Sequence, residues 1–315
     1  MVRDVDALVA GARQGRTRDI ARLISLIEDG APEVPALMRA LAPTSGRASV
    51  IGITGSPGVG KSTTTSALIS AFRSRGQRVG VLAVDPSSPF SGGALLGDRI
   101  RMQEHATDEG VFIRSMASRG HLGGLSATTP QALRVLDAAG CDVVLVETVG
   151  VGQSEVEVAA AADTTLVLLA PGMGDSIQAA KAGILEIGDV FVVNKADRDG
   201  ADATVRELRM MIALGDHPER RWTPPVVKTV ASTSDGVEAL VEAIDEHHAW
   251  LVSSGELAVR RVRRARDEVE ALAVALLRRR LEAGEGSERL ASAAEQVAAG
   301  EIDPHTAAER LVDGT

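Results

Sequence analysis

Apolar residues follow two different spacings along the chain, and the changes between them mark three parts. Before about residue 45 and after about residue 252, apolar positions recur three and four residues apart, which predicts amphipathic helices. Between these segments, short runs of β-branched and aliphatic residues alternate with stretches of helical length. We therefore expect a helical N-terminal extension over 1–45, a central domain over 46–252 and a helical C-terminal arm over 253–315.

The central part is predicted to have an α/β fold. Its short runs are apolar almost throughout instead of alternating with polar residues, as is typical of strands buried on both faces. Segments of helical length separate them, so we expect a mostly parallel central sheet with helices on both faces. The predicted strands cover residues 50–54, 79–85, 111–115, 143–148, 165–170, 190–194 and 226–230.

The longest predicted helix covers residues 256–283, which contain no proline or glycine. Its apolar stripe needs a partner surface, and a second subunit is one place to bury it. Five of the seven residues from Arg260 to Arg266 are arginines, and acidic residues follow at once. We expect a salt-bridged helix face or an interface here in preference to a nucleic-acid site.

Composition narrows the classes of function for this chain of 315 residues. The formal net charge of −9 and the 2% aromatic content disfavour binding to nucleic acid. The single cysteine, Cys141, excludes an intramolecular disulfide and a site built on several cysteines. No apolar run approaches the roughly 18 residues of a membrane span, and the first residues lack a secretion signal. We expect a cytoplasmic protein that binds neither membranes nor nucleic acid.

The clearest motif is a phosphate-binding loop. Residues 55–63 fit the pattern GxxxxGK[ST] between a predicted strand and a predicted helix. Glycines let several backbone N–H groups and a helix N-terminus face an anion. Lys61 adds a charge at the β- and γ-phosphates, and Ser62 offers a hydroxyl to Mg²⁺. Nucleotide contacts are expected from Gly55, Ser56, Pro57, Gly58, Val59, Gly60, Lys61, Ser62 and Thr63.

A second motif, NKxD, predicts the choice of base. It follows the predicted strand over 190–194 and consists of Asn194, Lys195 and Asp197. The carboxylate of Asp197 accepts hydrogen bonds from guanine N1–H and the 2-amino group, whereas adenine has neither donor there. After the last predicted strand, Ala231 and Ser232 are expected to supply a backbone donor to guanine O6. GTP is therefore favoured over ATP.

Carboxylates follow two apolar runs at the edge of the sheet where ligands bind. Asp85 ends one predicted strand and Glu147 lies near the end of another, and Mg²⁺ is a natural partner for such acids. The alternative is that each acid caps the turn that follows it. Asp98, in a segment rich in glycine, serine and proline, is a further candidate for the metal shell, although a plain surface loop has the same composition.

On these motifs, the chain resembles the MeaB/ArgK family, within the SIMIBI class of P-loop GTPases. The resemblance rests on residues 55–63, 84–102, 118–126, 147–155, 174–187 and 194–197, in family order. It covers about residues 45 to 250, and the helical extensions also fit.

The resemblance implies a homodimer formed by the C-terminal arm, and a chaperone that gates delivery of adenosylcobalamin to methylmalonyl-CoA mutase and protects that enzyme. It implies that Lys61, Asp98, Glu147 and Gly150 are catalytic. Magnesium ligands are expected among Ser62, Asp85, Asp98 and Glu147. Residues that couple the nucleotide to the partner are expected to be Gln153, Asp175, Gln178 and Lys181.

The expected activity is hydrolysis of GTP to GDP and phosphate. Because no arginine finger is evident, the unassisted rate is expected to be slow, about 10⁻⁴ to 10⁻² per second, and to rise when a partner binds. Two alternatives remain open. One is a P-loop kinase or ATPase associated with transport of lysine, arginine or ornithine, and the other is a GTPase that inserts a metal into an enzyme.

Overall fold

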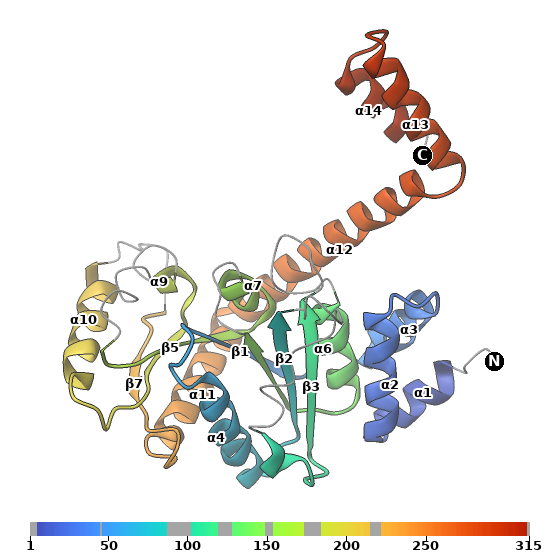
Figure 1. Ribbon diagram of the computed structural model, residues 1–315. Coiled ribbons are helices and arrows are strands. Elements are labelled where there is room, and N and C mark those ends of the chain that lie inside the picture. Colours follow the sequence, from blue (N-terminus) through green and yellow to red (C-terminus); the bar gives the residue numbers. More distant parts are fainter. Residues whose placement is uncertain are drawn as a thin grey trace. The chain divides into compact units, whose positions relative to one another are not determined.

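A sheet of seven parallel strands forms the centre of the structure (Figure 1). The computed structural model describes residues 5–44, 46–86, 102–118, 128–148, 154–172, 184–214 and 222–313. The strand order is β3-β2-β4-β1-β5-β6-β7. The strands are β1 (Ser49–Thr54), β2 (Val79–Pro86), β3 (Val111–Ser118), β4 (Val143–Thr148), β5 (Thr164–Leu169), β6 (Val190–Val193) and β7 (Val226–Lys228). The predicted fold class and the positions of all seven strands are confirmed, although several ends are shifted.

Helices cover both faces of this sheet, and further helices lie before and after it. Those before the sheet are α1 (Val5–Arg13), α2 (Thr17–Glu28) and α3 (Val34–Leu41). Those between strands are α4 (Lys61–Ser74), α6 (Thr129–Ala138), α7 (Ser154–Ala161), α9 (Ile184–Ile187) and α10 (Ala201–Leu214). Those after the sheet are α11 (Val237–Ser254), α12 (Glu256–Glu282), α13 (Glu285–Ala298) and α14 (Pro304–Asp313). Two short 3₁₀ helices cover Ala42–Thr44 and Gln103–His105.

Alternate residues of each strand enter different cores. In β4, Val144 and Val146 pack in a cluster with α6, whereas Val143 and Leu145 pack in a cluster with α4 and α11. Both sets are buried because successive side chains of a strand point to opposite faces. This explains why the strands are apolar throughout.

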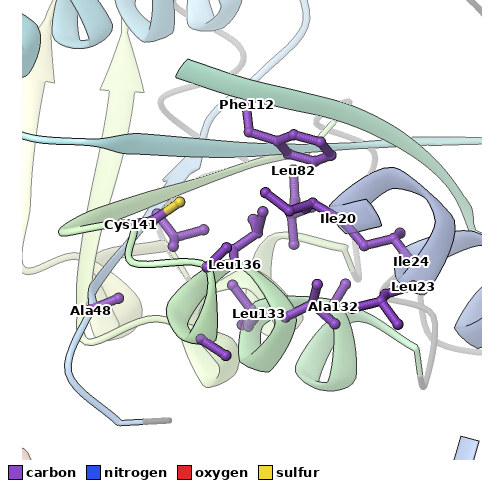
Figure 2. Close-up of a cluster of buried hydrophobic side chains, with 14 of the residues drawn as sticks. Ile20, Leu23, Ile24, Ala48, Leu82, Phe112, Ala132, Leu133, Leu136 and Cys141 are labelled. Carbon is purple, nitrogen blue, oxygen red and sulfur yellow. The ribbon is translucent and has the colours of Figure 1, made fainter. Parts of the chain in front are cut away.

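The N-terminal helices belong to one of these cores. Ile20 and Leu23 of α2 share a buried cluster with Leu82, Phe112 and Ala132 (Figure 2). An ion pair between Arg114 of β3 and Glu28 of α2 adds a polar link between the helix and the sheet. The segment before the sheet therefore packs against its edge and shares its hydrophobic core.

The chain divides by its contacts into two compact units, residues 1–261 and 262–315. In the second unit, α13 packs against α14, and Ala307 and Leu311 are buried. Within this unit α12 leaves large apolar side chains exposed, among them Val262, Val269 and Leu276. Among the helices in the described ranges, none combines the length and the low polarity that a membrane span requires.

Two arginines at the start of α12 pair with carboxylates at the beginning of strands. Arg260 donates from both terminal nitrogens to the carboxylate of Asp189, at 2.9 Å each, and Asp189 directly precedes β6. Arg261 donates to Asp163, which precedes β5, at 3.0 Å. Both aspartates are buried, so each needs a positive partner. The arginine-rich segment was expected to form a salt-bridged helix face or an interface. Salt bridges are confirmed for Arg260 and Arg261, and their partners are acids that precede strands.

A buried histidine lies beside the same carboxylates. His247 is 0% exposed, and its Nδ1 lies 2.9 Å from the hydroxyl of Thr164. Its Nε2 lies 3.4 Å from Asp189. Burial lowers the pKa of His247 to about 4, and this outweighs the opposite effect of Asp189. His247 is therefore neutral at physiological pH.

We predict that Arg260→Ala lowers the free energy of unfolding by about 2 kcal/mol, because Asp189 keeps its buried charge and loses its main cation. A drop in the thermal midpoint measures this. The matched control is Arg278→Ala, which breaks the exposed Arg278–Glu282 pair and is expected to have no measurable effect. Equal shifts in the two variants would refute the role given to Arg260.

A second prediction concerns stability at acid pH. A histidine with a pKa of about 4 in the folded protein and about 6.5 in the unfolded chain favours unfolding as the pH falls from 6.5 towards 4. We expect about 3 kcal/mol to be lost over this window. His247→Gln removes this component, which urea titrations between about pH 4.5 and 7.5 detect as a flatter profile. His305→Gln, at an exposed position, is the control, and a profile of His247→Gln that follows the wild type contradicts the prediction.

Candidate functional site

The phosphate-binding motif forms the connection between β1 and α4. Gly55 has φ of +137°, and a Cβ atom there would lie 2.3 Å from the carbonyl oxygen of Leu168. Gly60 has φ of +99°, and a Cβ atom there would lie 2.4 Å from Nδ2 of Asn194. Both positions therefore require glycine for two reasons, backbone conformation and space. The loop follows its strand directly and leads into the N-terminus of α4, as the motif predicts.

Lys61 lies across this loop. Its side chain is largely buried, with the residue 7% exposed. The ammonium group donates to the carbonyl oxygens of Gly55 at 2.7 Å and Ser56 at 3.3 Å. These contacts hold the positive charge within the loop, where a phosphate chain would be bound.

Ser62 and Glu147 meet beneath the loop. Glu147 of β4 pairs in register with Ile53 of β1, which brings its side chain under the start of α4. Ser62 Oγ donates to Glu147 Oε1 at 2.7 Å, and both residues are buried. Asp85 lies in β2, the neighbour of β4 on the side away from β1. The two predicted acids are thus on adjacent strands at the same edge of the sheet.

The NKxD motif is joined to the phosphate loop by two side chains. Asn194 Nδ2 donates to the carbonyl oxygen of Val59 at 2.8 Å. Lys195 Nζ donates to the carbonyl oxygen of Gly58 at 2.6 Å. Since both acceptors belong to the phosphate loop, the base-selecting segment and the phosphate-binding segment are held as one assembly.

Asn194 also organises the loop that follows β7. Its Oδ1 accepts from the hydroxyl of Thr229 at 3.2 Å and from the backbone N–H of Ala231 at 3.1 Å. The N–H of Ala231, expected to serve as a donor to guanine, is therefore directed at Asn194. Ser232 is exposed next to it.

Asp197 is exposed, and no hydrogen bond or ion pair within the described parts of the chain engages its carboxylate. Lys195, two residues earlier, has φ of +57°, a conformation that side-chain-bearing residues rarely adopt. Such local strain is typical of functional loops. The carboxylate is thus available to an incoming ligand at the end of β6.

Several predicted site residues lie outside the described residues. They are Asp98, Gly150, Gln153, Asp175, Gln178 and Lys181. Within the described ranges, no group of three or more histidine, cysteine, aspartate or glutamate side chains is arranged to hold a metal ion.

Two hydroxyls of this site were not predicted from the sequence. Thr65 Oγ1 donates to Glu147 Oε2 at 2.8 Å, and Thr229 donates to Asn194 as described above. Thr65 lies three residues after Ser62, and this spacing places both on the same face of a helix. That spacing was the available signal for Thr65, whereas nothing near Thr229 marks it as a partner of Asn194.

The family model described as "Methylmalonyl Co-A mutase-associated GTPase MeaB" matches residues 20–285. A relative from Pyrococcus abyssi is 46% identical over 310 residues, which are 98% of this chain and 96% of that protein. The mouse protein named methylmalonic aciduria type A homolog, mitochondrial, is 39% identical over 214 residues, 67% of this chain and 52% of its own length.

A solved structure extends the likeness to three dimensions. The structure described as "Crystal structure of LAO/AO transport system kinase" matches with a TM-score of 0.71 and 28% identity, and covers 99% of this chain and 98% of that one. The phosphate loop, the NKxD segment and the buried acid of β4 all lie within the part matched by the family model. This chain therefore belongs to the MeaB family and is a GTPase.

Proposed function

We propose that this GTPase gates the delivery of adenosylcobalamin to methylmalonyl-CoA mutase and protects that enzyme. The observation that carries the proposal is the match of residues 20–285 to a family described by its association with the mutase. The mouse relative, whose name refers to methylmalonic aciduria, points to the same metabolism. We place this function in the cytoplasm.

In this proposal, the loop of residues 55–63 binds the phosphates of GTP. Its backbone N–H groups and the N-terminus of α4 face the anion, and Lys61 supplies a charge that moves from the loop carbonyls to the phosphates. A water oxygen then bonds to the γ-phosphorus while the bond from that phosphorus to the β,γ-bridging oxygen breaks. GDP leaves, and inorganic phosphate and a proton are the other products. The catalytic roles proposed for Asp98 and Gly150 belong to the same step.

The oxygen atoms of this site suit Mg²⁺, which prefers hydroxyl, carboxylate and water oxygens. Ser62 and Glu147 bring such groups together in a buried place, and Asp85 lies on the adjacent strand. We propose that these residues and Asp98 hold the ion. When bound, the ion would supply positive charge that offsets the negative charge of the phosphates. Glu147 keeps the hydroxyl of Ser62 oriented.

Coupling to the mutase is proposed for Gln153, Asp175, Gln178 and Lys181, by resemblance to the family. The proposal also includes a homodimer through residues 253–315. Its support is the spacing of Val262, Val269 and Leu276, which recur every seven residues and are 70%, 67% and 53% exposed. Apolar residues at this spacing form a stripe that a second helix covers.

Base selection is tested by changing Asp197. Asp197→Asn replaces an acceptor of the guanine 2-amino group with an amide that donates to the 2-carbonyl of xanthine. We expect affinity for GTP to fall at least about 100-fold and affinity for XTP to rise, measured by competition against labelled GDP. Asp199→Asn, at an exposed position in the same turn, is the control. Tighter binding of ATP than of GTP by the wild type would contradict the assignment.

The client is tested by measuring GTP hydrolysis with and without adenosylcobalamin-dependent methylmalonyl-CoA mutase. We expect a slow rate that rises about tenfold or more with the mutase and is lost in Lys61→Ala, because partner binding orders the catalytic groups. If the mutase does not change the rate of GTP hydrolysis, the proposal that the mutase is the partner of this GTPase is refuted. Transfer of phosphate from ATP to a protein would favour the alternative of a transport-associated kinase, the activity after which the similar solved structure is named.

A further inference from the structure

Two hydroxyls of one helix bind the two oxygens of Glu147. Ser62 Oγ donates to Oε1 at 2.7 Å, and Thr65 Oγ1 donates to Oε2 at 2.8 Å. Ser62 is 5% exposed, Thr65 is 0% exposed and Glu147 is 2% exposed. The carboxylate is therefore held at both oxygens by α4, in a region from which water is largely excluded.

Hydrogen bonds to both oxygens of Glu147 restrict the rotation of its carboxylate, whereas a bond to one oxygen does not. A carboxylate held through one oxygen rotates about its terminal bond, because that bond has only a broad preference. Donors on both oxygens remove this rotation and fix the plane of the group. With that plane fixed, Oε1 remains directed at the hydroxyl of Ser62, which keeps the orientation of that hydroxyl constant.

Thr65 has a second acceptor within reach, the carbonyl oxygen of Lys61 at 3.1 Å. A hydroxyl has a single proton, so it donates fully to only one of the two. The carboxylate is the closer acceptor and carries a charge, and charge-assisted hydrogen bonds are the stronger ones. The bond to Glu147 is therefore the favoured one.

The neighbouring threonine shows what a purely structural hydroxyl does here. Thr64 is also 0% exposed, and its hydroxyl donates to the carbonyl oxygen of Gly60, four residues earlier in the chain, at 3.0 Å. Thr64 and Thr65 thus match in residue type, burial and helical turn. They differ in that the hydroxyl of Thr65 also binds the acid.

We propose that Thr65 is a positioning residue for GTP hydrolysis, which acts by fixing the carboxylate of Glu147 for its task of orienting Ser62. This inference rests on the proposed function, in which Ser62 and Glu147 hold the magnesium ion of the nucleotide. Thr65 itself touches neither the nucleotide nor the ion in this proposal.

The test compares Thr65→Val, Thr65→Ser and the control Thr64→Val in the full-length protein. Valine keeps the shape of threonine and removes the hydroxyl, whereas serine retains it. We expect Thr65→Val to lower kcat for GTP by about 10- to 100-fold with KM changed less than about threefold, since a hydrogen bond to a charged group is lost. Thr65→Ser is expected to stay within about threefold of the wild type, as is Thr64→Val.

A binding measurement provides a readout apart from activity. The affinity for GDP is measured by fluorescence at a series of Mg²⁺ concentrations. Thr65→Val is expected to need more Mg²⁺ for the same GDP affinity, and Thr64→Val the wild-type amount. Equal behaviour of the two valine variants in both measurements, or a failure of Thr65→Ser to restore kcat, overturns the proposal.

Two further controls separate the possible failures. Thermal midpoints show whether Thr65→Val is folded at the assay temperature, and if it is not, Thr65→Ala is measured against Thr64→Ala with the same expectations. Lys61→Ala tests the site itself. If Lys61→Ala hydrolyses GTP at the wild-type rate, the proposed site is refuted. If Lys61→Ala loses GTP hydrolysis and Thr65→Val does not, only the role of Thr65 is refuted.

Discussion

Buried carboxylates at the ends of the parallel strands constrain this structure. A carboxylate removed from water is unstable unless charged or hydrogen-bonding groups replace the lost hydration. Glu147 meets this requirement near the carboxyl end of β4 with hydroxyls of α4, and Asp163 and Asp189 meet it before β5 and β6 with arginines of α12. The elements that supply these donors are those that shape the site and attach the long helix.

The site itself depends on one amide as much as on one acid. Asn194 contacts the phosphate loop through Nδ2, and the segment after β7 through Oδ1. An amide suits this place because it donates and accepts at once, whereas a carboxylate of the same size only accepts. The arrangement of the loops that bind phosphate and base is thereby fixed before any ligand is present, which lowers the entropy lost on binding.

Local sequence was sufficient to predict the strands and the phosphate loop. The strands are continuous apolar runs because both faces of the sheet are covered, and the loop carries glycines at Gly55 and Gly60 where no side chain fits. The predicted ends of the strands were less accurate. The third strand was predicted to end at residue 115, whereas β3 continues to Ser118 because hydrogen bonding to β2 extends it beyond the apolar run. The joint core of α2 and the sheet was not predicted, because it depends on contacts distant in sequence.

The motifs of the site were predicted from the sequence, but the hydrogen bonds and ion pairs that hold the motif residues in place were not. Gly58 and Lys195 belong to known patterns, but their hydrogen bond joins residues 137 positions apart. The pairing of Arg260 with Asp189 likewise spans 71 positions, and the composition around Arg260 indicated only that some acid would be near. Thr65 was missed because its partner, Glu147, lies on β4, 82 positions away in the chain.

The shortness of β6 has a mechanical consequence. Asp189, which binds Arg260 of the long helix, and Asn194, which organises the nucleotide loops, stand at opposite ends of this strand. An extended chain rises about 3.3 Å per residue, so these two anchor points are about 17 Å apart along a backbone that is hydrogen-bonded on both sides. A paired strand does not stretch. A displacement of the first turn of α12 is therefore either absorbed by the side chains at Asp189 or transmitted along the rigid backbone of β6 to Asn194.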